Sequence, residues 1–251
     1  MLLNVEEIVK NYDGIRALNR ISLQVRKGTV KGLMGPNGAG KSTLFHLISG
    51  MERPDSGRIS FKDKQITGLP IHEVSRLGVG RTFQTLQVFG NMTVVENVLT
   101  GMHVRIRGGI LSFGLSLPWT RKREEAAMEE AKEILEHLGL FGRWKWYASQ
   151  LSYGEQKRLE IARALAAKPD LILLDEPAAG LTYPEAKQLA ENLSRLREAG
   201  FTLFLIEHHM GMVMEIADEV AVLNNGELLA EGPPDIVKKD PGVIEAYMVR
   251  K

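Results

Sequence analysis

Alternating apolar and polar positions characterise the first part of the chain. Residues 2–9 and 17–25 mix the two kinds of side chain, as half-buried strands do, and residues 58–61 form a similar stretch. Clusters of turn-forming residues separate these segments, at 11–14 and 54–57. Antiparallel pairing is the simplest arrangement for strands joined in this way. The pattern therefore predicts an antiparallel β region near the N-terminus.

Three later segments, 30–34, 171–174 and 201–206, are largely apolar along their whole length. Such runs suit parallel strands that helices cover on both faces. Each run ends at residues of special chemistry, and open parallel sheets bind ligands at the carboxyl ends of their strands. We therefore expect a functional site at this edge of the sheet.

Helical periodicity and capping residues fill most of the remaining chain. They predict helices after Gly40, over 121–138, from Ser152, and over 184–199. Residues 220–230 predict a hairpin with Asn225-Gly226 as its turn. Because strand, loop and helix alternate around 30–50 and again from 170 onward, the predicted fold is α/β. It has a core with a mainly parallel sheet, an N-terminal antiparallel β subdomain and an inserted helical subdomain.

Composition narrows the class of protein. The 251 residues are 44% hydrophobic and 25% charged, with 32 basic and 31 acidic side chains and a net charge of +1. These values are typical of a globular chain and give no reason to expect a nucleic-acid partner held by bulk charge. The absence of cysteine excludes disulfides and thiolate chemistry. No stretch reaches the ~18 apolar residues of a membrane span, and no export signal is evident, so we expect a soluble, cytoplasmic chain whose membrane role comes through a partner.

A glycine-rich loop follows the first apolar run. Residues 35–42 read GPNGAGKS and match the pattern G-x-x-x-x-G-K-[ST] between a predicted strand and a predicted helix. The glycines let backbone N–H groups surround phosphate oxygens, while Lys41 reaches the β- and γ-phosphates and the Ser42 hydroxyl ligates Mg²⁺. The alternative is a glycine-rich turn with a surface lysine.

Polar residues also end the other two apolar runs. Asp175 and Glu176 follow the second, where Asp175 would hold Mg²⁺ and Glu176 would polarise a water as general base. The alternative is two solvated carboxylates at a strand end. His208 and His209 follow the third, where a neutral His208 could donate a hydrogen bond to a phosphate oxygen. Metal binding by the two histidines is a further alternative, and His209 is otherwise a helix-start or surface residue.

A second candidate anion site precedes the helix that begins after Ser152. Ser152 and Glu155 fit a capping box, so the segment is explained by a well-capped helix alone. A functional interpretation adds that Ser152, the Gly154 backbone and the helix dipole bind phosphate. Sequence alone does not place this segment relative to the glycine-rich loop.

Taken together, these segments resemble the ATP-binding subunit of an ABC transporter, in the right order over nearly the whole chain. Gly35 to Thr43 is similar to the Walker A loop, Gln84 to the Q-loop glutamine and Leu151 to Glu155 to the signature motif. Leu171 to Asp175 is similar to Walker B, Glu176 to the catalytic glutamate and His208 to the switch histidine. Tyr12 lies where the family has an aromatic that stacks on adenine; the alternative is an ordinary turn tyrosine.

The resemblance implies a full set of site residues. Catalysis is assigned to Glu176, His208 and Gln84, and Mg²⁺ ligation to Ser42, Gln84 and Asp175. Contacts to ATP are assigned to Tyr12, Gly35, Pro36, Asn37, Gly38, Ala39, Gly40, Lys41, Ser42, Thr43, Ser152, Gly154 and Glu155.

The resemblance also implies an architecture and partners. Residues 1–251 form a single ATPase domain with a P-loop NTPase (RecA-like) core, in which 1–85 and 166–251 make the nucleotide-binding core and 86–165 an inserted helical subdomain. Two subunits form a head-to-tail dimer, and each ATP lies between the loop of one subunit and Ser152 and Gly154 of the other. The second subunit is this chain or a paralogue. Membrane permease subunits dock beside Gln84 at the cytoplasmic face of the inner membrane, and a solute-binding protein acts indirectly.

Two residues depart from the family pattern. Tyr153 replaces a glycine usual in the signature, which bears on the phosphate contact between subunits. Thr182 replaces an aspartate usual after Walker B, which bears on the water contact across the dimer. Neither changes the residues assigned to Mg²⁺ and to the general base.

Several segments are similar to the ATPase subunits of branched-chain amino-acid importers, including 175–181, 205–210, 159–165 and 243–247. An extra stretch at 103–120, either an exposed loop or a docking segment, is shared with them and disfavours a lipopolysaccharide exporter. Import of urea or short amides stays an alternative, because cargo contacts lie in other subunits. A soluble ABC ATPase of translation or DNA repair is a further alternative. Such proteins carry tandem ATPase halves or long coiled coils in one chain, and this sequence has a single set of motifs and no heptad run. A GTPase or small-molecule kinase would share the Walker A loop but would not need the signature motif or the strand that ends at His208.

Overall fold

The computed structural model describes residues 1–82, 86–102 and 118–248. The chain divides into two compact units. The first, called the sheet unit, comprises Met1–Arg81, Asp170–Ala179 and Leu196–Lys251, and the second, called the helical unit, comprises Thr82–Pro169 and Gly180–Arg195. The grouping of residues 180–195 with the helical unit is not indicated by the sequence, and the predicted subdomain boundaries stay a prediction.

An antiparallel sheet forms the N-terminal part of the sheet unit. Its strands follow the order β2-β1-β4-β5, and all pairs are antiparallel, as predicted. The strands are β1 (Leu3–Tyr12), β2 (Ile15–Val25), β4 (Ser56–Phe61) and β5 (Lys64–Gln65). Alternation decides which face is buried: Leu3 and Val5 of β1 are buried and Asn4 between them is half-buried.

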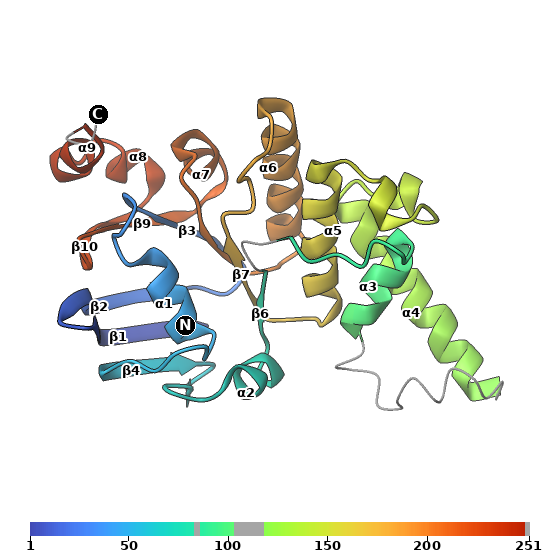
Figure 1. Cartoon of the computed structure of the whole chain (residues 1–251), viewed down its shortest axis with the longest axis horizontal. Coiled ribbons are helices and arrows are strands. Elements are labelled where there is room, and N and C mark those ends of the chain that lie inside the picture. The colour runs from blue at the N-terminus through green and yellow to red at the C-terminus, as the bar shows by residue number, and fades with distance from the viewer. Residues whose placement is uncertain (83–85, 103–117, 249–251) are drawn as a thin grey trace. The chain divides into compact units, whose positions relative to one another are not determined.

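The second sheet of this unit carries the three apolar runs as neighbouring strands. Its order is β10-β9-β3-β8-β7-β6, parallel throughout except for the β9–β10 hairpin (Figure 1). The strands are β3 (Val30–Met34), β6 (Val79–Arg81), β7 (Leu171–Asp175), β8 (Leu203–Ile206), β9 (Glu219–Asn224) and β10 (Glu227–Gly232). The parallel pairing and the hairpin are both confirmed, although β8 begins two residues later than the apolar run. The carboxyl ends of β7, β8 and β3 therefore lie at one edge.

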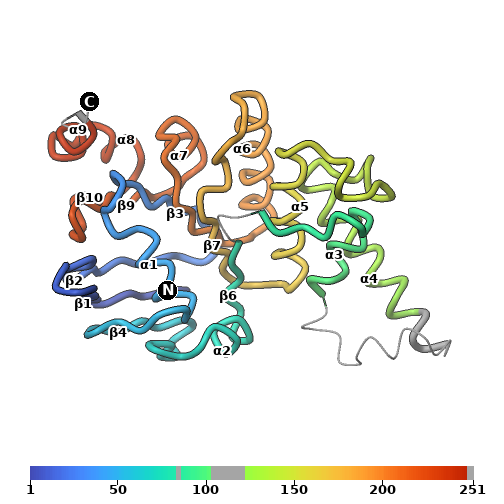
Figure 2. The backbone as a smooth tube through the Cα atoms, viewed as in Figure 1, coloured from blue at the N-terminus to red at the C-terminus, as the bar shows by residue number. Residues whose placement is uncertain are grey.

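One helix packs against both sheets of the sheet unit. α1 (Lys41–Ile48) buries Leu44, Phe45 and Ile48 in a core that takes side chains from both sheets, and the Phe45 and Phe204 ring centroids are 4.9 Å apart. Figure 2 shows its backbone leaving the end of β3 and running beside β1 and β2. The other helices of the unit are α2 (Ile71–Arg76), α7 (Met210–Ile216), α8 (Pro234–Val237) and α9 (Pro241–Met248). The packing fixes the helix that follows the glycine-rich loop.

The helical unit is built around α5 (Tyr153–Ala166). Its other elements are α3 (Val94–Met102), α4 (Pro118–His137), the 3₁₀ turns η2 (Phe141–Arg143) and η3 (Ala148–Gln150), and most of α6 (Tyr183–Glu198). The predicted helices over 121–138, from Ser152 and over 184–199 are thus confirmed, with ends shifted by one to three residues. α3 and α5 cross closely, because a Cβ added at Gly101 would lie 2.1 Å from the Arg163 carbonyl oxygen. Within the described ranges, no helix has both the length and the apolar character needed to cross a bilayer.

A buried lysine links the two sheets of the sheet unit. Lys31 of β3 is 1% exposed, and its Nζ donates to the carbonyl oxygen of Gln24 in β2 at 2.6 Å. The same ammonium pairs with Glu219 of β9 at 3.4 Å and with Glu231 of β10. This lysine therefore fills a position of an otherwise apolar strand because two carboxylates and a carbonyl satisfy its charge.

Replacing this lysine is expected to destabilise the fold. Lys31→Met keeps most of the volume but leaves Glu219 and Glu231, which are 28% and 30% exposed, without their shared cation. Leaving polar partners unsatisfied in this way costs about 1–3 kcal/mol. The free energy of unfolding from urea denaturation measures the loss. Lys27→Met, at an exposed position three residues from β3, is the matched control and should change stability by no more than about 0.5 kcal/mol. Equal stability of the two variants would contradict a structural role for the Lys31 pairs.

Candidate functional site

Two glycines give the loop between β3 and α1 its shape. Gly35 has φ 146°, and a Cβ there would lie 2.2 Å from the Leu223 carbonyl oxygen. Gly40 has φ 99°, and a Cβ there would lie 2.6 Å from the Ala17 carbonyl oxygen. Both positions combine positive φ with backbone contact, so no other residue type fits without distortion. The predicted loop, from Gly35 to the start of α1 at Lys41, is held in place by β9 and β2.

Lys41 lies inside this loop. Its Nζ donates to the carbonyl oxygens of Gly35 at 2.8 Å and Pro36 at 3.0 Å, and the residue is 6% exposed. Burial lowers the pKa of Lys41, while the carboxylates of Glu176 and Asp175 act in the opposite direction. The glycine-rich loop and the acidic pair, more than 130 residues apart in sequence, are therefore close enough to interact electrostatically.

Asp175, the last residue of β7, pairs with Arg81, the last residue of β6. The Arg81 Nη2 to Asp175 Oδ2 distance is 2.9 Å, and the two side chains are 6% and 8% exposed. Arg81 also donates from Nη1 to the Ser49 hydroxyl at 2.8 Å, which ties β6 to the residue that follows α1. Burial lowers the pKa of Arg81 and Asp175 raises it, as expected for a desolvated pair.

Glu176 and His208 meet at the edge of the sheet. The His208 Nε2 to Glu176 Oε1 distance is 2.7 Å, and the Glu176 N–H donates to the Ile206 carbonyl oxygen at 3.0 Å. Glu176 has φ 48°, a left-handed conformation that non-glycine residues seldom adopt and that is typical of functional turns. The pairing of β7 with β8 thus brings together two of the three predicted catalytic side chains. A carboxylate in this position can accept a proton, with an imidazole at its side.

The residues assigned to Mg²⁺ fit a hard cation in their chemistry. Asp175 offers a carboxylate and Ser42 a hydroxyl, the oxygen donors that Mg²⁺ prefers. Ser42 is exposed in the first turn of α1, and Asp175 lies at the carboxyl end of β7. The third assigned ligand, Gln84, lies outside the described residues, as does the stretch 103–117.

Tyr12 lies against α1, next to the glycine-rich loop. The Tyr12 hydroxyl donates a hydrogen bond to the Glu52 carboxylate, and the Thr43 side chain also hydrogen-bonds with Tyr12. Burial and the hydrogen bond to Glu52 raise the pKa of Tyr12 to about 12. The ring is partly exposed, and the Lys10 Nζ lies 5.1 Å from its centroid. The ring is thus held in one place and stays partly exposed, and adenine stacking stays a prediction.

In the helical unit, Ser152 caps α5. Its hydroxyl accepts from the Glu155 N–H at 3.3 Å, and Glu155 accepts from the Ser152 N–H at 2.9 Å, which confirms the capping box. The Glu155 carboxylate also pairs with Arg143 at 2.5 Å. The predicted capped helix is therefore confirmed, and phosphate binding by this segment stays a prediction.

The two departures from the family pattern have local structural consequences. Thr182 caps α6, because its N–H and hydroxyl donate to Glu185 at 2.9 and 2.7 Å. Tyr153 is 45% exposed, and a Cβ at Gly180 would lie 3.1 Å from its ring. Gly154 is equally confined, since a Cβ there would lie 2.8 Å from a Glu185 carboxylate oxygen. All of these contacts lie within the helical unit.

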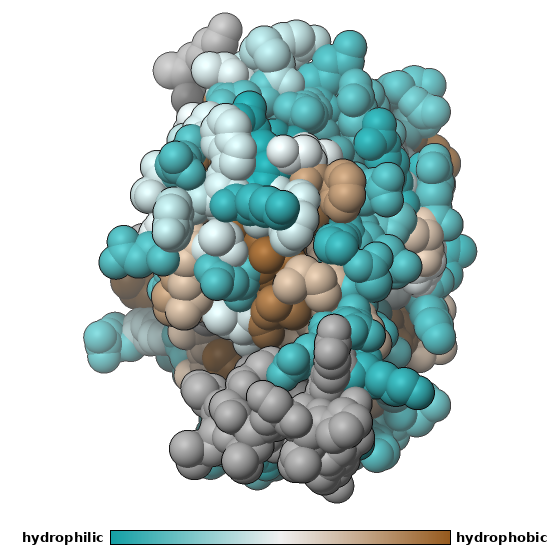
Figure 3. Space-filling view, turned by 90° about the vertical axis from the view of Figure 1, so that its right-hand side faces the viewer, coloured by the Kyte–Doolittle hydropathy of each residue, from teal (hydrophilic) through white to brown (hydrophobic). Residues whose placement is uncertain are grey.

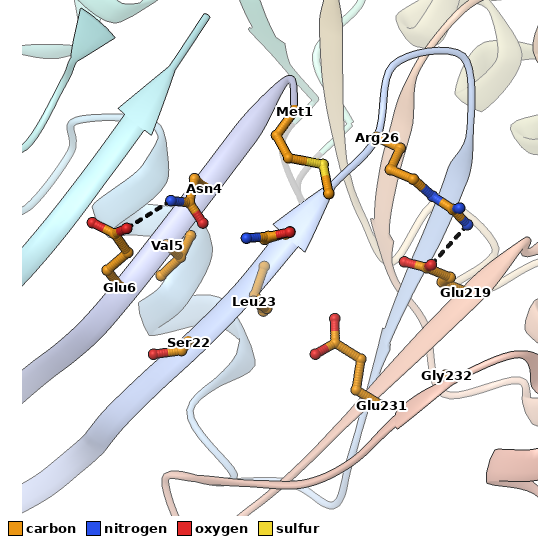
Figure 4. A pocket seen from close by; sticks show the side chains of 11 residues that line it. Met1, Asn4, Val5, Glu6, Ser22, Leu23, Arg26, Glu219, Glu231 and Gly232 are labelled. Atoms are coloured by element: carbon orange, nitrogen blue, oxygen red, sulfur yellow. Dashed lines mark hydrogen bonds and ion pairs between the residues drawn. The ribbon is translucent and has the colours of Figure 1, made fainter. Parts of the chain in front are cut away.

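A cavity of about 520 Å³ opens elsewhere in the sheet unit (Figure 4). Its lining comes from β1, β2 and the β9–β10 hairpin, and Arg26 pairs with Glu219 at its side at 2.7 Å. Glu231 points into the space between the strands. None of the predicted site residues that the structure describes lines this cavity, so it is separate from the glycine-rich loop.

Two residues at the site are not anticipated by the motifs. Arg81 pairs with Asp175, and Glu207, between β8 and His208, is 2% exposed and accepts from the Ala178 N–H at 2.6 Å. The signal for Glu207 is present in the sequence, because a third acidic residue ends an apolar strand. Its partner Ala178 is 29 residues away, and that contact depends on the fold.

Comparison with known proteins identifies the family. The family model described as "ABC transporter" matches residues 18–179, and one described as "Branched-chain amino acid ATP-binding cassette transporter" matches residues 227–248. The high-affinity branched-chain amino acid transport ATP-binding protein LivG of Salmonella typhimurium is 41% identical over 248 residues, which is 98% of this chain and 97% of that protein.

Solved structures agree with this result. The ADP conformation of an ATP-binding cassette of an ABC transporter superposes with a TM-score of 0.85 and 37% identity, over 100% of this chain and 99% of that one. The dimeric structure of a bacterial ABC transporter cassette has a TM-score of 0.75 and 26% identity, over 93% of this chain and 99% of that one. A chain with this loop, this acidic strand end and these relatives belongs to the ABC transporter family, as one of its ATP-binding cassettes.

Proposed function

We propose that this chain is the ATP-hydrolysing subunit of an ABC importer of branched-chain amino acids. The observation that carries the ATPase assignment is the contact between Glu176 and His208, in the same unit as the loop that holds Lys41. The names of the relatives and the family model that matches 227–248 support the cargo.

The side chains divide the hydrolytic step between them. Backbone N–H groups of the glycine-rich loop and the Lys41 ammonium bind the phosphate oxygens, and Tyr12 stacks on adenine. Glu176 takes a proton from the attacking water, while His208 holds the carboxylate and faces the γ-phosphate. Ser42, Asp175 and Gln84 would hold Mg²⁺, which would neutralise phosphate charge when bound.

Two copies of the chain, or this chain and a paralogue, form the complete site. Each ATP lies between the glycine-rich loop of one subunit and Ser152 and Gly154 of the other, arranged head to tail. The start of α5 suits this role, because a helix N-terminus carries partial positive charge that favours an anion. The dimeric cassette among the similar structures supports the arrangement.

Permease subunits connect the ATPase subunits to the membrane, and a solute-binding protein delivers cargo to them. The chain then acts at the cytoplasmic face of the inner membrane. Figure 3 shows apolar side chains gathered among hydrophilic ones on the side where α3, α4 and α5 lie. Exposed large apolar residues of the helical unit include Phe89, Met92, Phe141, Trp146 and Tyr147. Exposed apolar side chains of this kind favour contact with a protein partner.

Purification from native membranes and reconstitution test this proposal. A tagged chain is expected to bring permease subunits with it, and the complex in proteoliposomes should take up labelled leucine when ATP is supplied on the side of the cassette. Uptake of urea in place of leucine would refute the cargo, and stable insertion of the isolated chain into lipid would refute the need for a partner. The Glu176→Gln complex is the matched control and should take up neither.

A further inference from the structure

A buried carboxylate contacts the backbone close to both Glu176 and His208. Glu207 is the residue after β8 and is 2% exposed. Its Oε1 accepts from the Ala178 N–H at 2.6 Å, and its Oε2 accepts from the His208 N–H at 3.1 Å. The two oxygens of one carboxylate therefore bind two different loops.

These two loops are the ones that carry the catalytic pair. Ala178 lies two residues after Glu176, and the Ala179 N–H donates back to the Glu176 carbonyl oxygen at 3.1 Å, so residues 176–179 form one turn. His208 is the residue next to Glu207. Ala178 in one loop and His208 in the other are therefore joined through the Glu207 carboxylate.

The chemistry explains why a carboxylate occupies this position. Burial raises the pKa of Glu207, and backbone N–H groups of Ala178, His209 and His208 oppose that rise. Hydrogen bonds to a carboxylate are shorter and stronger than those to a neutral acceptor. Glutamine has nearly the same shape but only one acceptor oxygen, so its amide group would face a backbone N–H and one loop would lose its anchor.

We propose that Glu207 is a positioning residue that couples the loop of Glu176 to His208 and fixes the position of the two catalytic side chains relative to each other. The inference rests on the proposed ATPase function and adds a residue to it. Glu207 is buried, and its effect on hydrolysis passes through the backbone of Ala178 and His208.

Glu207→Gln tests this role. Small displacements of catalytic groups reduce turnover strongly, so kcat for ATP hydrolysis should fall about 10- to 100-fold. KM for ATP should stay within about twofold, because the glycine-rich loop and Tyr12 are not involved. Glu215→Gln, which removes an exposed acid from the neighbouring helix α7, is the matched control and should keep wild-type kcat. A normal kcat in folded Glu207→Gln, or a loss of ATP affinity equal to the loss of kcat, would overturn the inference.

A double-mutant cycle separates coupling from general damage. If Glu207 acts through His208, adding Glu207→Gln to His208→Ala should lower kcat no further than about twofold, because the side chain that it positions is already gone. Losses that multiply would contradict the coupling. Should Glu207→Gln purify unfolded, Glu207→Asp replaces it in both experiments, since it keeps the charge but withdraws the carboxylate by one methylene, and the same outcomes apply. A wild-type chain without ATPase activity would refute the proposed function, whereas an active wild type with an unaffected Glu207 variant would refute only this inference.

Discussion

Glu176→Gln is expected to lower ATP hydrolysis by about 1,000-fold and to leave ATP binding intact. A general base contributes about 10²- to 10⁴-fold to a proton-transfer step, and an amide cannot accept the proton of the attacking water. The amide still hydrogen-bonds with His208, so the geometry of the strand end is kept. Removal of the charge also relieves repulsion between Glu176 and the phosphates, which favours bound ATP.

Phosphate release and ATP affinity, measured on the same preparation, test this expectation. Glu191→Gln, at an exposed position of α6, is the matched control and should hydrolyse ATP like the wild type. Hydrolysis by Glu176→Gln within tenfold of wild type would show that another group removes the proton. Loss of binding together with hydrolysis would show that Glu176 holds the nucleotide instead.

Lys41→Ala is expected to weaken ATP binding by about 100-fold and to abolish turnover at ordinary ATP concentrations. Hydrogen bonds from a charged donor contribute about 1.5–3 kcal/mol, and Lys41 is the buried cation of the glycine-rich loop. Its ammonium donates to the loop's own carbonyl oxygens, so it lies inside the loop that we propose binds phosphate. Titration calorimetry with ATP measures the loss.

A matched lysine variant and a thermal melting curve are the controls for this measurement. Lys27→Ala, at an exposed position, should bind ATP normally. A melting temperature close to that of wild type would exclude unfolding as the cause of weak binding. Wild-type affinity and full ATPase activity in Lys41→Ala would contradict the assignment of the loop.

Local sequence patterns predict much of this fold because they encode local physics. The loop at 35–42 needs its glycines at particular φ angles, the hairpin needs Asn225-Gly226, and the start of α5 needs its capping pair. Each of these features involves residues near one another in the chain. The apolar runs predict parallel strands for a similar reason, since burial on both faces excludes polar positions.

Contacts between distant segments could not be predicted in this way. Glu176 meets His208 only because β7 and β8 are neighbours, and Arg81 meets Asp175 only because β6 pairs with β7. The bond from Ala178 to Glu207 depends on the same order of strands. The sequence placed candidate residues at strand ends, and the order of the strands decides which of them touch.

Departures from a family pattern are also explained by tertiary contacts. Thr182 lacks the carboxylate that the pattern expects, yet its hydroxyl and N–H cap α6 through Glu185. Sequence comparison marks such a position as unusual, while the structure gives it a local function.

We propose that ATP is held between two ATPase subunits, and two copies of this chain form the simplest such pair. Sedimentation velocity of Glu176→Gln, with Mg²⁺ and enough ATP to saturate binding, tests it most directly. We predict a shift from monomer to dimer that requires ATP and that disappears in the double variant Lys41→Ala, Glu176→Gln. A Glu176→Gln chain that binds ATP fully and still sediments as a monomer at every protein concentration would contradict the claim.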